Sequence, residues 1–248
     1  MQADEYIKNQ NFNFLTKRLH KWRFLLAKKF IESEIDVLDS SEKSICIVDF
    51  GCGTASFFDY LVNEDVNKGR FKYLGVEVSD EFIEHANTRY ASDTRFSMVK
   101  NLTFDDVKAK RDDLHHIFIS LETFEHLQYC FRIETIKNLG EYYNLPFLIT
   151  VPNELGWGLL VKNIGSLLMG YSARFKEYGW RNTYYAFNSR LDQMSAHTTY
   201  HKGFDWRALQ YEIRQFCKFK LYKRRFLGIA LISIAFMRSS KLKKSEDK

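Results

Sequence analysis

The chain has 248 residues, of which 45% are hydrophobic and 27% are charged, and its formal net charge is +6. This length suits one large α/β domain, or one domain with an insertion, and the composition is that of a soluble globular protein. The positive charge permits an anionic partner but does not require one.

The cysteines and the apolar pattern exclude several classes of protein. The four cysteines are scattered and form no Cys-x-x-Cys pair, which argues against a zinc site or a disulfide framework and favours a reducing compartment. The N-terminus, MQADEYIKNQ, is polar and carries acids, unlike a signal peptide. No uncharged apolar run reaches the roughly 20 residues of a membrane-spanning helix. We therefore expect a cytoplasmic protein.

The predicted elements alternate between helices and strands as far as residue 154. Apolar residues at helical spacing, with Lys and Arg on the other face, predict an N-terminal helix over 14–37. Apolar runs predict strands at 45–50, 71–78, 95–99, 115–122 and 146–154. Helices are expected at 56–64, after the capping residue Ser79, and through 132–143. This alternation favours an α/β fold with a doubly wound, mostly parallel sheet and helices on both faces.

The rhythm changes after Glu154. Residues 155–190 are glycine-dotted, aromatic and basic, and we expect a lid-like insertion there with peripheral contact to a membrane. A helix at 204–216 and an antiparallel strand pair divided at Leu227–Gly228 complete an expected seven-stranded sheet. The expected organisation is a helical cap (1–40), a core (41–154), a lid or acceptor insertion (155–203), closing elements of the core (204–240) and a disordered basic tail (241–248).

The segment SICIVDFGCGTASFF, residues 44–58, places two glycines directly behind an apolar strand. Glycine lets the backbone turn sharply and lets a ligand approach closely, at the edge where open α/β sheets bind ligands. A P-loop would need a lysine that is absent here, and a dinucleotide site would have a glycine where Ser56 stands. S-adenosylmethionine is the third ligand class that uses such a loop, and an ordinary strand-to-helix turn is the alternative.

The same segment resembles the first motif of class I, Rossmann-like S-adenosylmethionine-dependent methyltransferases, written D/E-x-G-x-G-x-G. Asp49, Gly51 and Gly53 match it, and Ala55 replaces the third glycine. YLGVEVSDEFIEHA, FISLETFEHL and FLITVPNE resemble, in order, the second, fourth and fifth strand segments of the family. The resemblance covers residues 45–154 and implies S-adenosyl-L-methionine as the cofactor and S-adenosyl-L-homocysteine as the product.

The resemblance also implies the cofactor contacts. Glu77 would hold the ribose hydroxyls, Asp49 would act on the amino-acid end directly or through water, and Cys52 would offer its backbone amide. The other expected contacts are Val78, Asn101, Leu102 and Leu121, with Asn101 standing where the family has an acid that faces the adenine amine. Physical chemistry agrees, because a carboxylate can accept from vicinal hydroxyls and is favourable beside a cation.

His126 and His201 are the candidate catalytic residues. If the acceptor is a hydroxyl, an imidazole that is largely neutral at cytoplasmic pH can take its proton. A structural role is the alternative for His126, and lining the acceptor pocket is the alternative for His201. His197 and His201 are four residues apart, but without a nearby Cys or carboxylate we expect no metal site. The basic residues between 174 and 190 either bind an anionic acceptor or form a solvated face.

Methyl transfer from a sulfonium is an in-line displacement, so alignment of the reactants and exclusion of water are the main requirements. LETFEHL and TVPNE resemble the small-molecule group that methylates quinone precursors, sugars and glycan or lipid-linked intermediates. We therefore expect O-methylation of such an acceptor. The sequence lacks the [DNS]-P-P-[YFW] motif, which argues against a nucleic-acid substrate. The rival functions are an RNA methyltransferase, a non-catalytic scaffold with a methyltransferase fold, and a nicotinamide-dependent oxidoreductase.

Overall fold

The computed structural model describes residues 14–38, 45–66, 70–100, 114–142, 144–168, 172–194, 203–226, 228 and 230–240. Seven strands form one sheet in the order β3-β2-β1-β4-β5-β7-β6. Their bounds are β1 Ile45–Phe50, β2 Phe71–Glu77, β3 Phe96–Lys100, β4 His115–Leu121, β5 Phe147–Pro152, β6 Lys220–Phe226 and β7 Ala230–Arg238. β1 pairs in parallel with β2 and β4, and β2 with β3, whereas β6 and β7 are antiparallel. The sheet is therefore mixed, and the expected closing hairpin is confirmed.

The chain divides into two units, which we describe separately. The first unit comprises Met1–Leu121, Asn138–Ile149 and Arg238–Lys248, and the second comprises Glu122–Lys137 and Thr150–Met237. The basic tail expected at 241–248 lies outside the described residues.

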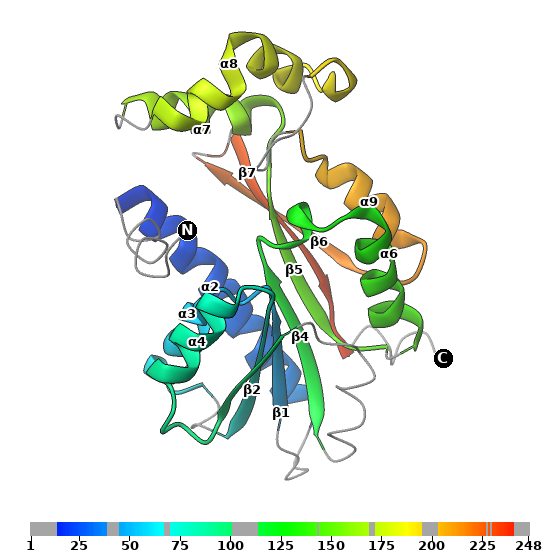
Figure 1. The fold of residues 1–248 in the computed structure, drawn as a ribbon. Helices are drawn as coiled ribbons and strands as arrows, with labels where there is room; N and C mark the ends of the chain where they lie inside the picture. The colour runs from blue at the N-terminus through cyan, green and yellow to red at the C-terminus, as the bar shows by residue number, and fades with distance from the viewer. Residues whose placement is uncertain are drawn as a thin grey trace. The chain divides into compact units, whose positions relative to one another are not determined.

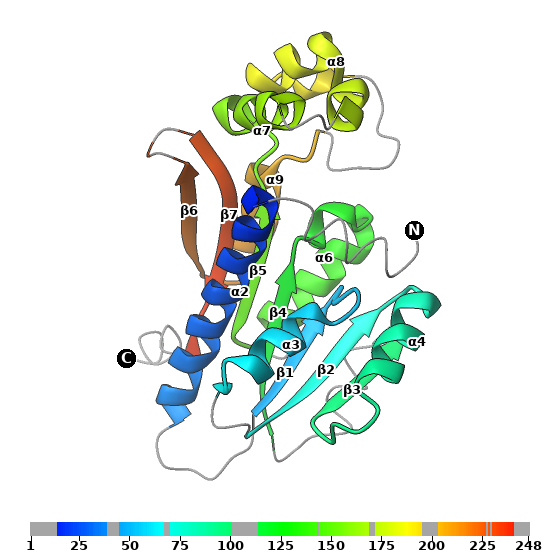
Figure 2. The same cartoon turned by 90° about the vertical axis from the view of Figure 1, so that its left-hand side faces the viewer.

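The first unit packs three α-helices against parallel strands. They are α2 (Phe14–Ile35), α3 (Ser56–Asn63) and α4 (Asp80–Arg89), and two short helices, η1 (Asp36–Leu38) and the π-helix η4 (Asn138–Tyr142), complete it. Figures 1 and 2 show α2, α3 and α4 on the same face of β1, β2 and β4. β1 is buried at every position, as its apolar run predicts. The predicted cap of α4 is also present, since Ser79 Oγ accepts a hydrogen bond from the Phe82 N–H.

An aromatic cluster holds α3 against β2, α4 and β3. The ring centroid of Phe58 lies 5.1 Å from that of Tyr73 and 5.0 Å from those of Tyr90 and Phe96. Phe58 and Tyr73 are fully buried. Each such ring contact contributes about 0.5–1.5 kcal/mol beyond the burial of its area. The cluster therefore fixes the start of α3, which follows the glycine turn, against β2 and β3 and the residue after α4.

The second unit contains four α-helices together with β6 and β7. The helices are α6 (Tyr129–Lys137), α7 (Gly156–Leu168), α8 (Ser172–Phe187) and α9 (Trp206–Arg214), and two 3-10 turns, η3 (Phe124–His126) and η5 (Leu191–Gln193), accompany them. α6 and α9 lie side by side (Figure 1), joined by a bidentate pair in which Arg132 Nε and Nη2 donate to the Glu212 carboxylate over 2.8 and 2.7 Å.

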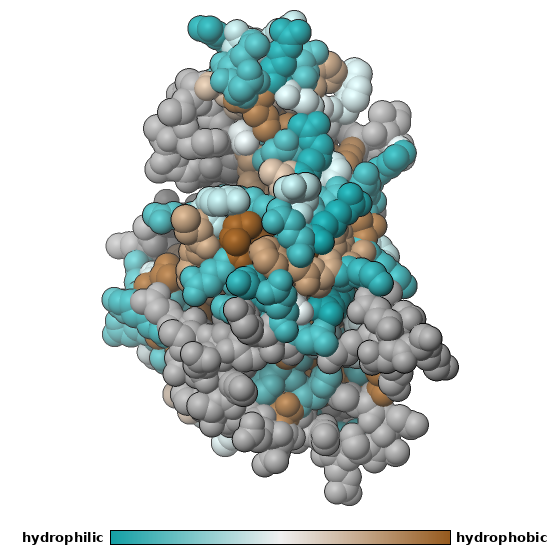
Figure 3. Space-filling model, turned by 90° about the vertical axis from the view of Figure 1, so that its right-hand side faces the viewer, coloured by the Kyte–Doolittle hydropathy of each residue, from teal (hydrophilic) through white to brown (hydrophobic). Residues whose placement is uncertain are grey.

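Figure 3 views the side on which Figure 1 draws α6 and α9, and there hydrophilic residues are interspersed with apolar ones. α7 and α8 lie within residues 155–203, the segment expected to form a lid. The described residues of this segment form no strand, which agrees with the lack of strand alternation in its sequence. No helix among the described residues has both the length and the apolar character needed to cross a bilayer.

Candidate cofactor site

The predicted glycine turn joins β1 to α3. Gly51 and Gly53 have φ values of 73° and 57°, in the left-handed region that glycine enters without steric cost. The turn is pinned to the neighbouring strand, because the N–H groups of Gly51 and Cys52 both donate to the Val76 carbonyl, over 2.8 and 3.2 Å. The end of β1 and the end of β2 therefore act as one rigid edge.

Ala55 stands where the resembling motif has its third glycine, and it adopts the conformation of a glycine. Its φ is 58°, and the residue is fully buried immediately before α3. A left-handed conformation costs an L-residue about 1–2 kcal/mol. The substitution therefore strains the turn but preserves its course.

Glu77, at the end of β2, has a carboxylate that accepts hydrogen bonds from three backbone N–H groups at this edge. Its Oε2 accepts from the Gly53 N–H over 2.9 Å, and its Oε1 accepts from the N–H groups of Val78 and Ser79 over 2.8 and 3.1 Å. A carboxylate offers about four lone-pair positions. Three are filled by backbone donors, so the carboxylate is held in place with about one acceptor position left on Oε2.

Asp49 provides a second carboxylate, this one almost fully buried on β1. The Tyr73 hydroxyl on β2 donates to its Oδ2 over 2.5 Å. The pKa of Asp49 is raised to about 7. Burial is the main cause, and the negative charge of Glu77 adds to it, whereas the hydrogen bond from Tyr73 lowers the pKa. An anion held at such a site is stabilised by a nearby cation.

Small side chains make room for this arrangement. Asp49 lies opposite Gly75 in the β1–β2 register. A Cβ atom on Gly75 would come within 2.8 Å of Cys52 Sγ and 2.9 Å of Met98 Cγ. Burial raises the pKa of the Cys52 thiol, and the charge of Asp49 adds to the effect, so the thiol is held protonated. The Cys52 N–H, which was expected to be offered to the cofactor, donates to the Val76 carbonyl over 3.2 Å.

The structure thus brings Asp49, Gly51, Cys52, Gly53 and Glu77 together. Val78 follows directly, with its side chain 69% exposed. Leu121 is the half-buried last residue of β4, the strand that pairs with β1. Asn101, Leu102 and His201 lie outside the described residues.

His126 belongs to the second unit, where it is the exposed last residue of η3 and its N–H donates to the Thr123 carbonyl over 2.9 Å. Glu122, immediately after β4, has a φ of 60°. Such strained positions cluster at functional sites. Glu122, Tyr73 and Gly75 were not among the predicted site residues, although all three lie within the segments that resemble the family. Their backbone conformation and strand register are properties of the folded chain that the sequence pattern does not reveal. No group of three or more His, Cys, Asp or Glu side chains that could hold a metal occurs within the described ranges.

Comparison with known proteins gives solved structures only. No protein-family model matches the chain, and no curated protein matches it. The DszA carbon methyltransferase superposes with a TM-score of 0.56 at 12% identity, over 93% of this chain and 56% of that one. The CMeT domain of the citrinin polyketide synthase gives 0.55 at 9% identity, over 97% and 60%. The chain has the fold of class I S-adenosylmethionine-dependent methyltransferases.

A further structure, a SAM-dependent methyltransferase from Aquifex aeolicus, gives a TM-score of 0.43 at 8% identity, over 85% of this chain and 90% of that one. The chain spans less than two thirds of the length of the DszA and citrinin synthase proteins. At such identities, the likeness to the DszA and citrinin synthase structures shows the methyltransferase fold alone.

The residues present fit the cofactor that this methyltransferase fold implies. S-adenosylmethionine carries two vicinal ribose hydroxyls, a cationic amino group and a cationic sulfur. Glu77 has an acceptor position to spare on a carboxylate that backbone amides already orient. Asp49 is a buried acid whose ionisation a cation would favour. These two carboxylates therefore match the hydroxyl and cationic groups of S-adenosylmethionine.

Proposed function

We propose that the protein is an S-adenosylmethionine-dependent methyltransferase that binds its cofactor along the edge formed by the ends of β1 and β2. The observation that carries this proposal is the Glu77 carboxylate, which accepts from the glycine turn on one side and from the start of α4 on the other. A carboxylate fixed by three amides loses little entropy when a hydroxyl binds, so it is preorganised for ribose.

Each polar residue of the edge has a distinct task in this proposal. Glu77 accepts from the ribose hydroxyls, and Asp49 attracts the amino group, directly or through water. Val78 is an exposed β-branched residue beside Glu77, and its side chain would pack on the adenine. Leu121, Asn101 and Leu102 are the other proposed contacts.

The bound cofactor would supply an activated methyl group on sulfur. The protein then has to hold the acceptor nucleophile in line with that methyl group and keep water away, which is a proximity effect. For a hydroxyl acceptor a base must take the proton, and His126 and His201 are the proposed candidates.

We further propose a small-molecule, glycan or lipid-linked acceptor and transfer to oxygen. One of the structures that superpose is named as a carbon methyltransferase and the other as the CMeT domain of a polyketide synthase. Transfer to oxygen and the class of acceptor are therefore proposed from the resemblance of LETFEHL and TVPNE to the small-molecule group.

A non-catalytic scaffold is the alternative function that Ala55 suggested. The structure weakens that argument, because Ala55 takes the left-handed conformation that the motif needs, with a φ of 58°. In this turn the Gly51 N–H donates to the Val76 carbonyl and the Gly53 N–H donates to Glu77. Loss of the third glycine is therefore no reason to expect loss of binding.

The test is a calorimetric titration with S-adenosylhomocysteine, with NAD as the rival ligand. Glu77→Gln keeps the size of the side chain, but its amide group can no longer accept at both ends. A lost hydrogen bond to a charged group is worth about 1.5–3 kcal/mol, so affinity should fall about tenfold to a hundredfold. Glu84→Gln, the same change at an exposed position on α4, is the matched control and should bind as the wild type does.

Retained affinity in a folded Glu77→Gln protein would remove the ribose assignment. Binding of NAD in place of S-adenosylhomocysteine would instead overturn the cofactor class and support an oxidoreductase.

A further inference from the structure

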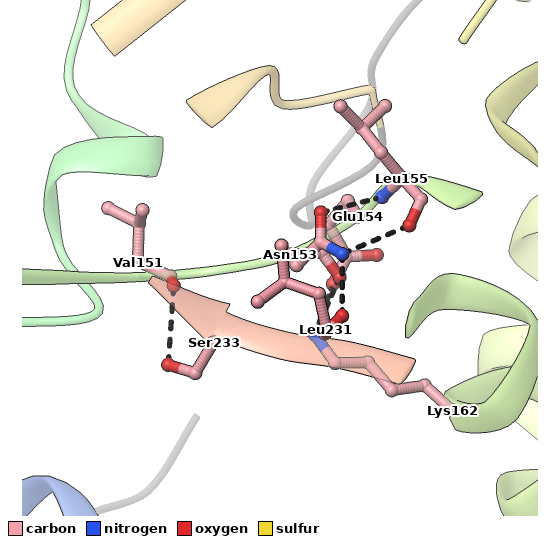
Figure 4. Close-up of polar contacts among 7 residues, drawn as sticks. All are labelled: Val151, Asn153, Glu154, Leu155, Lys162, Leu231 and Ser233. Carbon is pink, nitrogen blue, oxygen red and sulfur yellow. Dashed lines mark hydrogen bonds and ion pairs between the residues drawn. The ribbon is translucent and has the colours of Figure 1, made fainter. Parts of the chain in front are cut away.

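α7 is seated on the second unit by polar contacts on its inner side. A Cβ atom on Gly158 would lie 1.8 Å from the Leu231 carbonyl oxygen, so the helix backbone meets β7 directly. Asn153 Nδ2 donates to the Leu155 and Leu231 carbonyls over 3.0 and 2.6 Å, which ties the end of β5 to the same strand (Figure 4). These contacts determine which side of α7 faces the unit.

The polar side chains of α7 point inward. Lys162 Nζ donates to the Asn153 carbonyl over 2.9 Å and pairs with the fully buried carboxylate of Glu154 over 3.3 Å (Figure 4). Asn163 is also buried, and its Nδ2 donates to Thr183 Oγ1 on α8 over 3.2 Å. The polar residues of an ordinary surface helix lie on its solvent side. In α7 the arrangement is reversed.

The outward side of α7 is apolar. Trp157 and Ile164, seven residues apart and hence on one side of the helix, are 59% and 48% exposed. Leu160 and Val161, between them, are half-buried. A helix that exposes apolar residues on its outer side is normally covered there by protein or lipid.

α8 packs on α7 and also exposes aromatic residues. It is joined to α7 by the Asn163–Thr183 hydrogen bond and by an edge-to-face contact of Trp157 with Phe187, whose centroids are 5.2 Å apart. Trp180 and Tyr184, one helical turn apart, are 73% and 58% exposed. We call the set Trp157, Ile164, Trp180 and Tyr184 the outer face.

The segment that carries the outer face is rich in basic residues. Residues 155–191 contain five of them, Lys162, Arg174, Lys176, Arg181 and Arg190, against one acid, Glu177, and the acids Glu154 and Asp192 flank the segment. Lys162 is paired with Glu154 on the inner side of α7. Arg181 and Arg190, by contrast, are exposed close in sequence to Trp180 and Tyr184.

We propose that the outer face of α7 and α8 docks on the interfacial region of an anionic lipid bilayer. Tryptophan and tyrosine combine an apolar ring with a polar edge, which suits the boundary between headgroups and acyl chains. The exposed basic side chains of Arg181 and Arg190 match anionic headgroups. A second copy of the chain is a poorer occupant, because it would bring an equal positive charge against the first.

The first experiment is sedimentation of the full-length protein with vesicles. Vesicles of mixed phosphatidylglycerol and phosphatidylcholine should bind the protein at low salt, and vesicles of phosphatidylcholine alone should bind it more weakly. Trp180→Ser/Tyr184→Ser should reduce binding by at least about tenfold, which is about 1.4 kcal/mol. The matched control is Tyr129→Ser/Tyr211→Ser, which removes two aromatic residues exposed by 62% and 69% on α6 and α9 and should leave binding unchanged.

The second experiment locates the contact. Bromine-labelled lipids should quench the tryptophan fluorescence of the wild type, and Trp157→Phe/Trp180→Phe should lose most of this quenching while still sedimenting, because Phe keeps the apolar ring. Neither experiment needs cofactor, so its failure would leave the cofactor proposal intact.

Absence of binding to anionic vesicles at low salt, or an equal loss in the control pair, would overturn the proposal. Self-association that Trp180→Ser/Tyr184→Ser abolishes, in a protein that ignores vesicles, would overturn it in favour of a second copy.

Discussion

Replacing Asp49 with Asn should make the stability of the protein less dependent on pH. The side chain keeps its shape, and its carbonyl oxygen can still accept from the Tyr73 hydroxyl, which lies 2.5 Å from Oδ2 in the wild type. What disappears is the titration of a buried acid, whose pKa burial raises from 3.8 to about 7.

The sign follows from the raised pKa. The folded protein binds the Asp49 proton more tightly than the unfolded chain does, so stability falls as pH rises from about 4 through about 7. One pKa unit corresponds to about 1.4 kcal/mol. Between about pH 5.5 and pH 8 the wild type should lose about 2 kcal/mol from this one group, and Asp49→Asn should not.

Urea unfolding of both proteins at the two pH values measures the difference, and other titrating groups cancel in the comparison. Affinity for S-adenosylhomocysteine should change in the opposite way. In the wild type it should rise with pH as Asp49 ionises and attracts the amino group, whereas in Asp49→Asn it should be low and flat. Parallel stability curves for the two proteins would show that Asp49 does not titrate in this range and would refute the reasoning.

Three further predictions concern Ala55, Gly158 and His126. Ala55→Gly relieves about 1–2 kcal/mol of left-handed strain, but it loses about 0.8 kcal/mol from the buried methyl group and about 0.5–1 kcal/mol through backbone entropy. Its free energy of unfolding should therefore stay within about 1 kcal/mol of the wild-type value. Ala55→Val should be clearly destabilised. Gly158→Ala should lower the free energy of unfolding by about 1–3 kcal/mol or more, because the added Cβ would meet the Leu231 carbonyl. Gly165→Ala, on the same helix but with open space around the added Cβ, should raise it by about 0.5–1 kcal/mol. Equal effects of the two substitutions would contradict the packing argument. His126→Ala should lower kcat by about 10²–10⁴-fold and remove the acidic limb of its pH profile, with cofactor affinity within about twofold, if this histidine is the base; near-normal turnover would exclude it.

The elements of the sheet were predictable because they depend on local pattern. β1 and β5 are apolar except for Asp49 and Thr150, and both strands are buried at every position. The hairpin divides at Gly228, whose φ of 76° favours glycine. The mixed character of the sheet was foreseen only as far as this hairpin.

The candidate site was predictable only in part. Asp49 and Glu77 could be placed because Asp49 lies one residue before the end of β1 and Glu77 ends β2, and strand ends gather at one edge of a parallel sheet. The Tyr73 contact to Asp49 could not, since it depends on the β1–β2 register that sets Asp49 opposite Gly75. The hydrogen bond from the Gly53 N–H to Glu77 likewise joins residues 24 apart in sequence. Local periodicity carries no information about such pairs.

α7 shows why the second unit was harder to interpret from its sequence. In GWGLLVKNIGSLL apolar residues surround the helix, so the pattern cannot say which side is buried. Lys162 and Asn163 are polar and would ordinarily lie on the solvent side. Instead, Lys162 pairs with buried Glu154 and Asn163 donates to buried Thr183. Once these partners are known, the exposed side must be the apolar one that carries Trp157 and Ile164. The buried polar pairs therefore hold α7 with an apolar side toward solvent, the side on which the proposed bilayer contact depends.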